Sequence, residues 1–263
     1  MDHAKRRIGL YFGSFNPIHM GHLVIANHMA TYTNLDEVWL VVTPQNPQKG
    51  AHEMINQSHR LQMVLLAVSE NELLQGSDAE FDLPQPNYTA ATMRHMRAKH
   101  PDVEFSLIIG EDNFERLHSW RDHWELVQNH RILVYPRRSS DQDSMEIPSA
   151  KAEDVVPRNH INLQWCDAPM ISISSTYLRK AITDQKDIRY LLHDKVLNYI
   201  SNNHDMKYIK RILKIISVLL LTLNRKKYFN TSFFVLNTIF FFGIIFTLFY
   251  TSNYDYAIRK LQT

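Results

Sequence analysis

The residues with the clearest chemical potential lie in one segment near the start of the chain, GSFNPIHMGHL, from Gly13 to Leu23. His19 and His22 are three residues apart, so on a helical turn both imidazoles project from the same face. Asn16 and Pro17 favour a turn just before them. Two imidazoles where free N–H groups begin a helix can hydrogen-bond phosphate oxygens and stabilise charge that develops on them. The segment therefore predicts a phosphate-binding turn.

Other interpretations of this histidine pair are weaker. A His-x-x-His pair also occurs on ordinary surfaces and in metal sites, but no glutamate accompanies it here as in the HExxH zinc pattern. We therefore predict no metal ligands. The chain contains neither GxGxxG nor GxxxxGK[ST], which disfavours a nicotinamide-dependent dehydrogenase and a P-loop enzyme.

A second candidate segment, ISSTYLR, runs from Ile173 to Arg179. Ser174 or Ser175 is a good N-cap, so the segment should open a helix. Arg179 follows Ser175 by four residues, one turn along the same face. Hydroxyls, free N–H groups and a guanidinium would then converge, which suits a polyphosphate. The alternative is a capped helix with a solvated arginine, and closeness to His19 and His22 would decide between them.

Alternating strands and helices must position these two segments. Short apolar runs predict strands over 7–12, 37–43, 103–109, 131–135 and 161–165. Helical patterns cover 19–31, 58–69, 89–100, 112–130, 175–183 and 191–202. This alternation predicts an α/β fold, a Rossmann-like doubly wound parallel sheet with ligands at the carboxyl ends of its strands.

Charge divides the chain of 263 residues into two parts, which we predict as domains 1–205 and 206–263. The second part holds nine Lys or Arg residues against one acid, Asp255, so it carries +8. The overall net charge of +2 then leaves −6 on the first part. A net-acidic domain is not an obvious nucleic-acid binder, because that affinity depends on cationic side chains. The single cysteine, Cys166, suits a reducing compartment.

The second part predicts a hydrophobic helical tail. An uncharged run follows Arg225, Lys226 and Lys227, and a candidate transmembrane segment covers about 228–250. The basic triplet would keep residues 1–205 in the cytoplasm, and the basic stretch 207–214 could lie along an anionic membrane surface. Two alternatives stay open. The tail could pack as a helical hairpin on another subunit, or it could be an unselected extension.

Together, the two candidate segments resemble the HxGH and SSTxxR signatures of the nucleotidyltransferase superfamily. Over residues 7–204 the chain is similar to the bacterial nicotinate-nucleotide adenylyltransferases. The matching elements, in sequence order, are PQNPQKG (44–50) with Ser58-x-Arg60, NYTAAT (87–92), IIGEDNFERLHSW (108–120) and YPRR (135–138). Two departures are the turn GSFNP, where many relatives have GTFDP, and a loose match around Lys49.

The resemblance implies that AMP passes from ATP to nicotinate mononucleotide, giving deamido-NAD and pyrophosphate, with Mg²⁺ as the cofactor. No protein nucleophile is needed. The implied catalytic residues are His19, His22 and Arg179. The implied ATP-binding residues are these three with Gly13, Ser14, Phe15, Ser174, Ser175 and Thr176.

The resemblance also implies a site for the second substrate. Trp120 would stack on the pyridine ring, and the helix that begins at Tyr88 and Thr89 would receive the nicotinate carboxylate. Lys49 would meet a phosphate and Asp112 would bind sugar hydroxyls, with Arg137 completing the set. Without the resemblance, Trp120 would more often be a core residue, Lys49 a solvated charge and Asp112 a helix cap.

Rival functions stay open at this point. The same chemistry could act on nicotinamide mononucleotide or phosphopantetheine. A non-catalytic, membrane-anchored nucleotide-binding protein is a rival of another class. The predicted location is the cytoplasm, with membrane association through the tail as an addition, and a homo-oligomer is left open.

Overall fold

The computed structural model describes residues 4–44, 54–137 and 154–203. All of them belong to the first of the two units into which the chain divides, Met1–Lys207. The predicted tail, its candidate transmembrane segment and Lys49 lie outside the described residues. Within the described ranges, no helix is long and apolar enough to cross a membrane.

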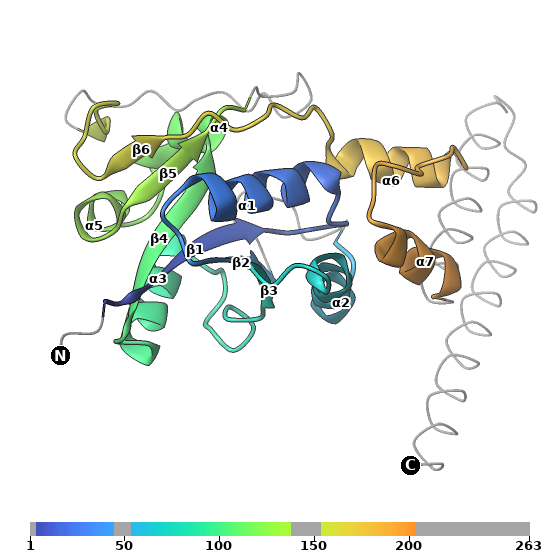
Figure 1. The fold of residues 1–263 in the computed structure, drawn as a ribbon, viewed down its shortest axis with the longest axis horizontal. Helices are drawn as coiled ribbons and strands as arrows, with labels where there is room; N and C mark the ends of the chain where they lie inside the picture. The colour runs from blue at the N-terminus through green and yellow to red at the C-terminus, as the bar shows by residue number, and fades with distance from the viewer. Residues whose placement is uncertain (1–3, 45–53, 138–153, 204–263) are drawn as a thin grey trace, which may run out of the picture. The chain divides into compact units, whose positions relative to one another are not determined.

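Six parallel strands form a single sheet (Figure 1). They are β1 (Arg6–Gly13), β2 (Glu37–Val42), β3 (Leu74–Ser77), β4 (Val103–Gly110), β5 (Ile132–Tyr135) and β6 (Leu163–Trp165). Their spatial order is β3-β2-β1-β4-β5-β6, and every neighbouring pair is parallel. The predicted doubly wound parallel sheet is confirmed. The strand order reverses between β1 and β4, which is where such folds bind ligands.

Helices pack on both faces of this sheet. One core contains residues of α1 (Met20–Tyr32), α2 (Gln57–Val68), α6 (Ser175–Thr183) and α7 (Asp194–Asn202). The other core contains residues of α3 (Thr89–Lys99), α4 (Glu111–Phe114) and α5 (His123–Asn129). Successive side chains of β5 point to opposite faces of the sheet. Leu133 lies in the first core, while Ile132 and Val134 lie in the second.

Two predictions about the elements were wrong. The helix expected over 112–130 is broken into α4, a 3₁₀ turn at Leu117–Ser119, and α5. Trp120 is extended and Asp122 has a left-handed φ of 56°, so the chain changes direction between them. Strand β3 was missed, because a four-residue edge strand with Leu74 as its one buried residue carries no periodic signal.

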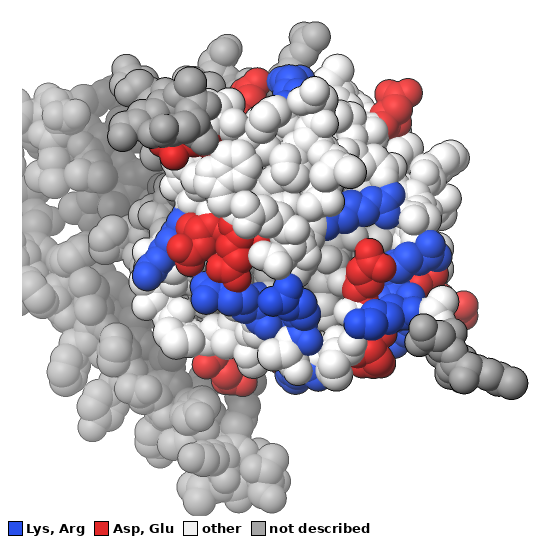
Figure 2. Space-filling view, turned by 90° about the vertical axis from the view of Figure 1, so that its left-hand side faces the viewer, with Lys and Arg blue, Asp and Glu red and all other residues white. Residues whose placement is uncertain are grey.

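Oppositely charged side chains are interspersed on the surface. Figure 2 shows Lys and Arg beside Asp and Glu over the face that it presents. Ion pairs among the described residues include Arg7 with Asp36 at 3.0 Å and Arg94 with Asp122 at 3.3 Å. This face therefore presents no large field of one sign.

A buried arginine joins the loops at the carboxyl ends of β1 and β2. Arg60, on α2, is 1% exposed and donates to four main-chain carbonyl groups. The distances are 2.9 Å to Ile55, 2.6 Å to Ser14, 2.7 Å to Thr43 and 3.0 Å to Pro44. Burial lowers the pKa of Arg60 to about 10, so it stays charged at neutral pH. Hydrogen bonds to a charged donor are stronger than neutral ones, so Arg60 fixes both loops.

Arg60→Met should destabilise the fold by about 3 kcal/mol or more, because it leaves several buried carbonyl groups without a donor. Urea unfolding followed by circular dichroism measures this change. Arg189→Met is the matched control, since Arg189 is exposed and pairs only locally with Asp187. The control should cost less than about 1 kcal/mol. Equal costs for the two variants would contradict the role given to Arg60.

Candidate active site

The loop after β1 brings the first histidine to the start of α1. Phe15 has a left-handed φ of 44° and is 1% exposed, so its ring turns back under the loop. A Cβ at Gly13 would lie 2.8 Å from that ring, which explains the glycine. His19 is the N-cap of α1 in an extended conformation. A Cβ at Gly21 would lie 3.1 Å from Nδ1 of His19, so this glycine leaves room beside the imidazole.

The two imidazoles stack on each other, with ring centroids 3.7 Å apart. The main-chain N–H of His19 donates to Nδ1 of His22 at 3.2 Å. Because Nδ1 accepts this bond, the neutral His22 ring carries its proton on Nε2. The loop thus fixes which nitrogen of His22 can donate to a phosphate oxygen.

His19 is an uncharged imidazole at neutral pH. It is 5% exposed, and burial, helped by the positive charge of Arg137, lowers its pKa to about 3. The N–H of His22 faces the His19 side chain as part of a capping box, but this contact does not satisfy the buried Nδ1 with full hydrogen-bond geometry. Buried polar atoms in folded proteins are almost always paired, so this nitrogen can take a further partner from a ligand at the start of the helix.

The second candidate segment packs directly against this loop. Arg179 donates to the carbonyl oxygen of Asn16 at 3.0 Å, although 163 residues separate them in sequence. The hydroxyl of Ser175 donates to the carbonyl oxygen of Pro17 at 3.0 Å. Figure 1 shows the first turns of α1 and α6 close together. The alternative of a solvated arginine far from the histidines is thereby excluded.

The first turn of α6 is built as its sequence predicts. The hydroxyl of Ser174, the N-cap, accepts from the N–H of Tyr177 at 3.1 Å. A guanidinium nitrogen of Arg179 lies 3.2 Å from the Thr176 hydroxyl. Two helix N-termini, two imidazoles and a guanidinium thus meet at the carboxyl end of the sheet. Such a cradle can bind a polyphosphate.

The carboxyl-terminal parts of β1, β4 and β5 and the residues that follow β4 and β5 supply a second group of polar residues. Nε of Arg137 lies 3.4 Å from Oδ2 of Asp112, while Oδ1 of Asp112 is buried without a partner among the described residues. The hydroxyls of Tyr11 and Tyr135 are 3.1 Å apart. The ring centroids of Tyr11 and His22 are 6.2 Å apart, so this group adjoins the histidine pair.

The remaining predicted residues lie around the start of α3. Tyr88 is the N-cap of α3 and Thr89 its first residue, with no side chain capping the helix. The guanidinium of Arg121 lies over the Tyr88 ring at 5.0 Å, so residue 121, next to Trp120, reaches this helix. Trp120 packs against the second core, and its buried Nε1 has no partner among the described residues. The proposed stacking role of Trp120 stays a prediction.

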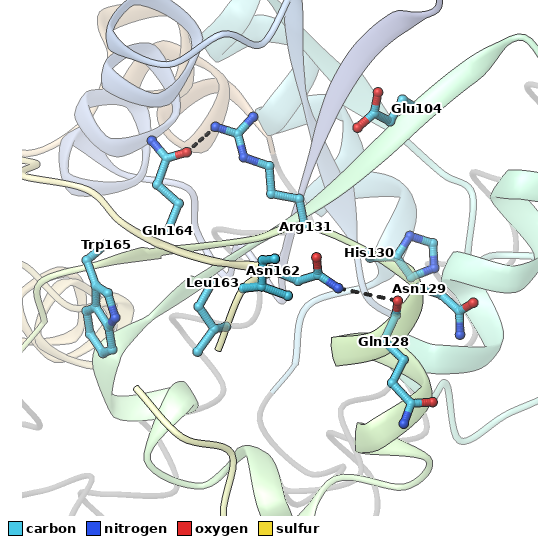
Figure 3. Close-up of a pocket in the computed structure, with 10 residues that line it drawn as sticks. Glu104, Gln128, Asn129, His130, Arg131, Asn162, Leu163, Gln164 and Trp165 are labelled. Carbon is cyan, nitrogen blue, oxygen red and sulfur yellow. Dashed lines mark hydrogen bonds between the residues drawn. The ribbon is translucent and has the colours of Figure 1, made fainter. Parts of the chain in front are cut away.

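A pocket of about 740 Å³ lies elsewhere on the sheet (Figure 3). It is lined by residues near the amino ends of β4, β5 and β6, with none of the predicted site residues among them. Its one arginine, Arg131, is already bonded to Asn34 and Gln164. The site residues predicted from the sequence therefore lie at the opposite end of the strands, away from this pocket.

Sequence reasoning assigned no role to three buried polar features near the carboxyl end of the sheet. They are the Arg60 bonds, the paired hydroxyls of Tyr11 and Tyr135, and the carboxyl of Glu80, which is 1% exposed. A tyrosine at the end of a buried strand was the one usable signal, because a buried tyrosine hydroxyl needs a partner. Glu80 sits in a loop with no pattern that marks it as buried.

Comparison with known proteins gives concordant results. The family model of the cytidylyltransferase-like proteins matches residues 10–181. A protein of Flavobacterium johnsoniae named as a nicotinate-nucleotide adenylyltransferase is 47% identical over 201 residues, 76% of this chain and 99% of its own. One of Christiangramia forsetii with the same name is 47% identical over 196 residues, 74% and 96% of the two chains.

A solved structure supports the fold. The Plasmodium falciparum nicotinic acid mononucleotide adenylyltransferase complexed with NaAD superposes with a TM-score of 0.60 at 20% identity. The match covers 76% of this chain and 98% of that one. The histidine pair, the docked SSTxxR segment and these relatives agree, and the chain belongs to the cytidylyltransferase-like superfamily and, within it, to the nicotinate-nucleotide adenylyltransferases.

Proposed function

We propose that the protein transfers AMP from ATP to nicotinate mononucleotide, which yields deamido-NAD and pyrophosphate. An oxygen of the mononucleotide phosphate attacks the α-phosphorus of ATP, and the bond from that phosphorus to the bridging oxygen of the β-phosphate breaks. The observation that carries this proposal is the docking of Arg179 and Ser175 on the loop before His19. Catalysis of this kind needs positioning and charge stabilisation, and no covalent intermediate with the protein.

Different residues of the cradle would contact different phosphates of ATP. Nε2–H of His22 would donate to the α-phosphate, where negative charge increases in the transition state. His19, kept neutral by burial, would add a hydrogen bond and no charge. Arg179 and the first turn of α6, with Ser174, Ser175 and Thr176, would hold the departing pyrophosphate. Gly13, Ser14 and Phe15 would lie along the nucleotide.

The second substrate would lie between β4, β5 and α3. Its carboxylate would accept from the N–H groups of Tyr88 and Thr89, and Trp120 would stack on the pyridine ring. Asp112 has a buried oxygen that a sugar hydroxyl could satisfy. Arg137 and Lys49 would meet its phosphate.

Magnesium would enter with ATP. Among the residues that the structure describes, there is no group of three or more His, Cys, Asp or Glu side chains that could hold a metal ion. Mg²⁺ prefers oxygen ligands and usually binds through substrate phosphates and waters with few carboxylates. The cradle of imidazoles, hydroxyls and a guanidinium fits this use, since the phosphate oxygens would supply the ligands and Mg²⁺ would neutralise part of their charge.

A comparison of acceptors tests the proposed function. The purified full chain is incubated with ATP, Mg²⁺ and either nicotinate mononucleotide, nicotinamide mononucleotide or phosphopantetheine, and pyrophosphate release is measured. The highest kcat/KM should be obtained with nicotinate mononucleotide. Activity with phosphopantetheine alone would overturn the substrate assignment, and no pyrophosphate with any acceptor would favour a non-catalytic nucleotide-binding protein.

His22→Ala should lower kcat by about 10²–10³-fold, because it removes a donor aimed at developing negative charge. Steady-state kinetics with saturating substrates measure the loss. His28→Ala, on the same helix, is the matched control, since His28 stacks on the exposed Tyr32. Near-full activity in His22→Ala would remove His22 from the mechanism.

The buried His19 should make the fold sensitive to acid. Its pKa is about 3 in the folded protein, against about 6.5 when unfolded, so only the unfolded chain binds its proton between these values. The contribution of His19 to the free energy of unfolding is fully present above pH 6.5. It decreases as the pH falls, by about 2 kcal/mol at pH 5. Urea unfolding at pH 8 and pH 5 measures this difference.

In His19→Asn, the decrease in the free energy of unfolding between pH 8 and pH 5 should be about 2 kcal/mol smaller than in the wild type. His28→Asn, measured in parallel, controls for the removal of a histidine from α1. An unchanged pH dependence in His19→Asn would show that His19 is not held neutral by the fold.

A further inference from the structure

A buried carboxyl that the proposed mechanism does not use lies between β3 and α3. Glu80 is 1% exposed, which is rare for a glutamate. The hydroxyl of Thr92, on α3, donates to its Oε1 at 2.7 Å. One side chain thus joins the loop after β3 to the first turn of α3.

The main chain of Glu80 is held in the same cluster. Nδ2 of Asn87 donates to the carbonyl oxygen of Glu80 at 3.2 Å, and Asn87 is 6% exposed. Asn87 immediately precedes Tyr88, the N-cap of α3. The cluster therefore connects the loop after β3 with the residues just before and within the first turn of α3.

We propose that Glu80 is a positioning residue for the nicotinate-binding end of the site. Through Thr92 and Asn87 it fixes the start of α3 relative to the loop after β3, and with it the N–H groups of Tyr88 and Thr89. This inference rests on the proposed function, in which those N–H groups receive the nicotinate carboxylate. The structure gives Glu80 no bond to the ATP cradle, so its effect should be confined to the acceptor substrate.

The hydrogen-bond pattern favours the neutral acid. Oε2 of Glu80 and Oδ1 of Asn87 are both buried, and neither has a partner among the described residues. Both atoms are acceptors when Glu80 is ionised, whereas a protonated carboxyl adds one donor to the cluster. Burial raises the pKa of Glu80, and the hydrogen bond from Thr92 opposes that shift. A neutral Glu80 also avoids a negative charge near the helix end that must bind an anion.

Three variants separate positioning from general stability. Glu80→Gln keeps the size, an acceptor and a donor. Glu80→Leu removes the hydrogen bonds, and Thr92→Val removes one hydroxyl with little change in shape. Val127→Ala, in α5, is the control for a core defect of similar cost, because Val127 is 0% exposed in the second core and touches none of the cluster's bonds. KM for each substrate and kcat are measured below the melting temperature of every variant.

The expected result is a selective change in acceptor binding. Glu80→Leu and Thr92→Val should each raise KM for nicotinate mononucleotide, about tenfold for Glu80→Leu, with KM for ATP changed less than about twofold. Their double variant should lose less than the product of the single losses, since both remove the same hydrogen bond. Glu80→Gln should stay within about threefold of the wild type. Val127→Ala should lower the melting temperature without this selectivity.

Two results would overturn the inference. One is a Glu80→Leu or Thr92→Val enzyme with an unchanged acceptor KM, or with both KM values raised equally. The other is a Glu80→Gln enzyme as impaired as Glu80→Leu, which would mean that the negative charge itself is required. If Glu80→Leu does not fold, Thr92→Val and Glu80→Gln still decide the question. A wild-type chain that does not use nicotinate mononucleotide would instead reject the proposed function.

Discussion

Two carbonyl oxygens, of Asn16 and Pro17, are the points at which the two ends of the described fold join. Arg179 and Ser175 donate to them, and these bonds place the start of α6 against the start of α1. A shared cradle depends on this contact, because without it the histidine pair and the SSTxxR segment would stand at two separate helix starts. The contact makes both helix N-termini available to one anionic ligand.

Burial sets the charge of each group around that contact. His19 is kept neutral, Arg60 keeps its charge among four carbonyl groups, and burial raises the pKa of Glu80. A neutral imidazole beside charged guanidinium groups donates a hydrogen bond without adding repulsion between cations. In the proposed function, positive charge beside the ATP phosphates would come from Arg179 and the helix N-termini, and Arg137 would meet the phosphate of the acceptor.

The sequence predicted the sheet and the two chemical segments because these depend on local patterns. Apolar runs marked β1, β2, β4 and β5, and the Ser174 cap marked α6. What local patterns could not provide was any feature set by contacts distant in sequence. The break at Asp122 follows from a left-handed backbone that tertiary packing selects, and the buried states of Arg60 and Glu80 depend on loops from several strands. The resemblance to a family supplied the substrate roles, and these remain proposals until they are tested.

The central claim is that the two segments form one cradle for the triphosphate of ATP. A crystal structure of the full chain with a non-hydrolysable ATP analogue and Mg²⁺ tests this claim most directly. The account predicts the α-phosphate within hydrogen-bonding distance of Nε2 of His22, with the β- and γ-phosphates against Arg179 and the first turn of α6. A triphosphate bound elsewhere, for example in the pocket beside Asn162 and Trp165, would contradict it.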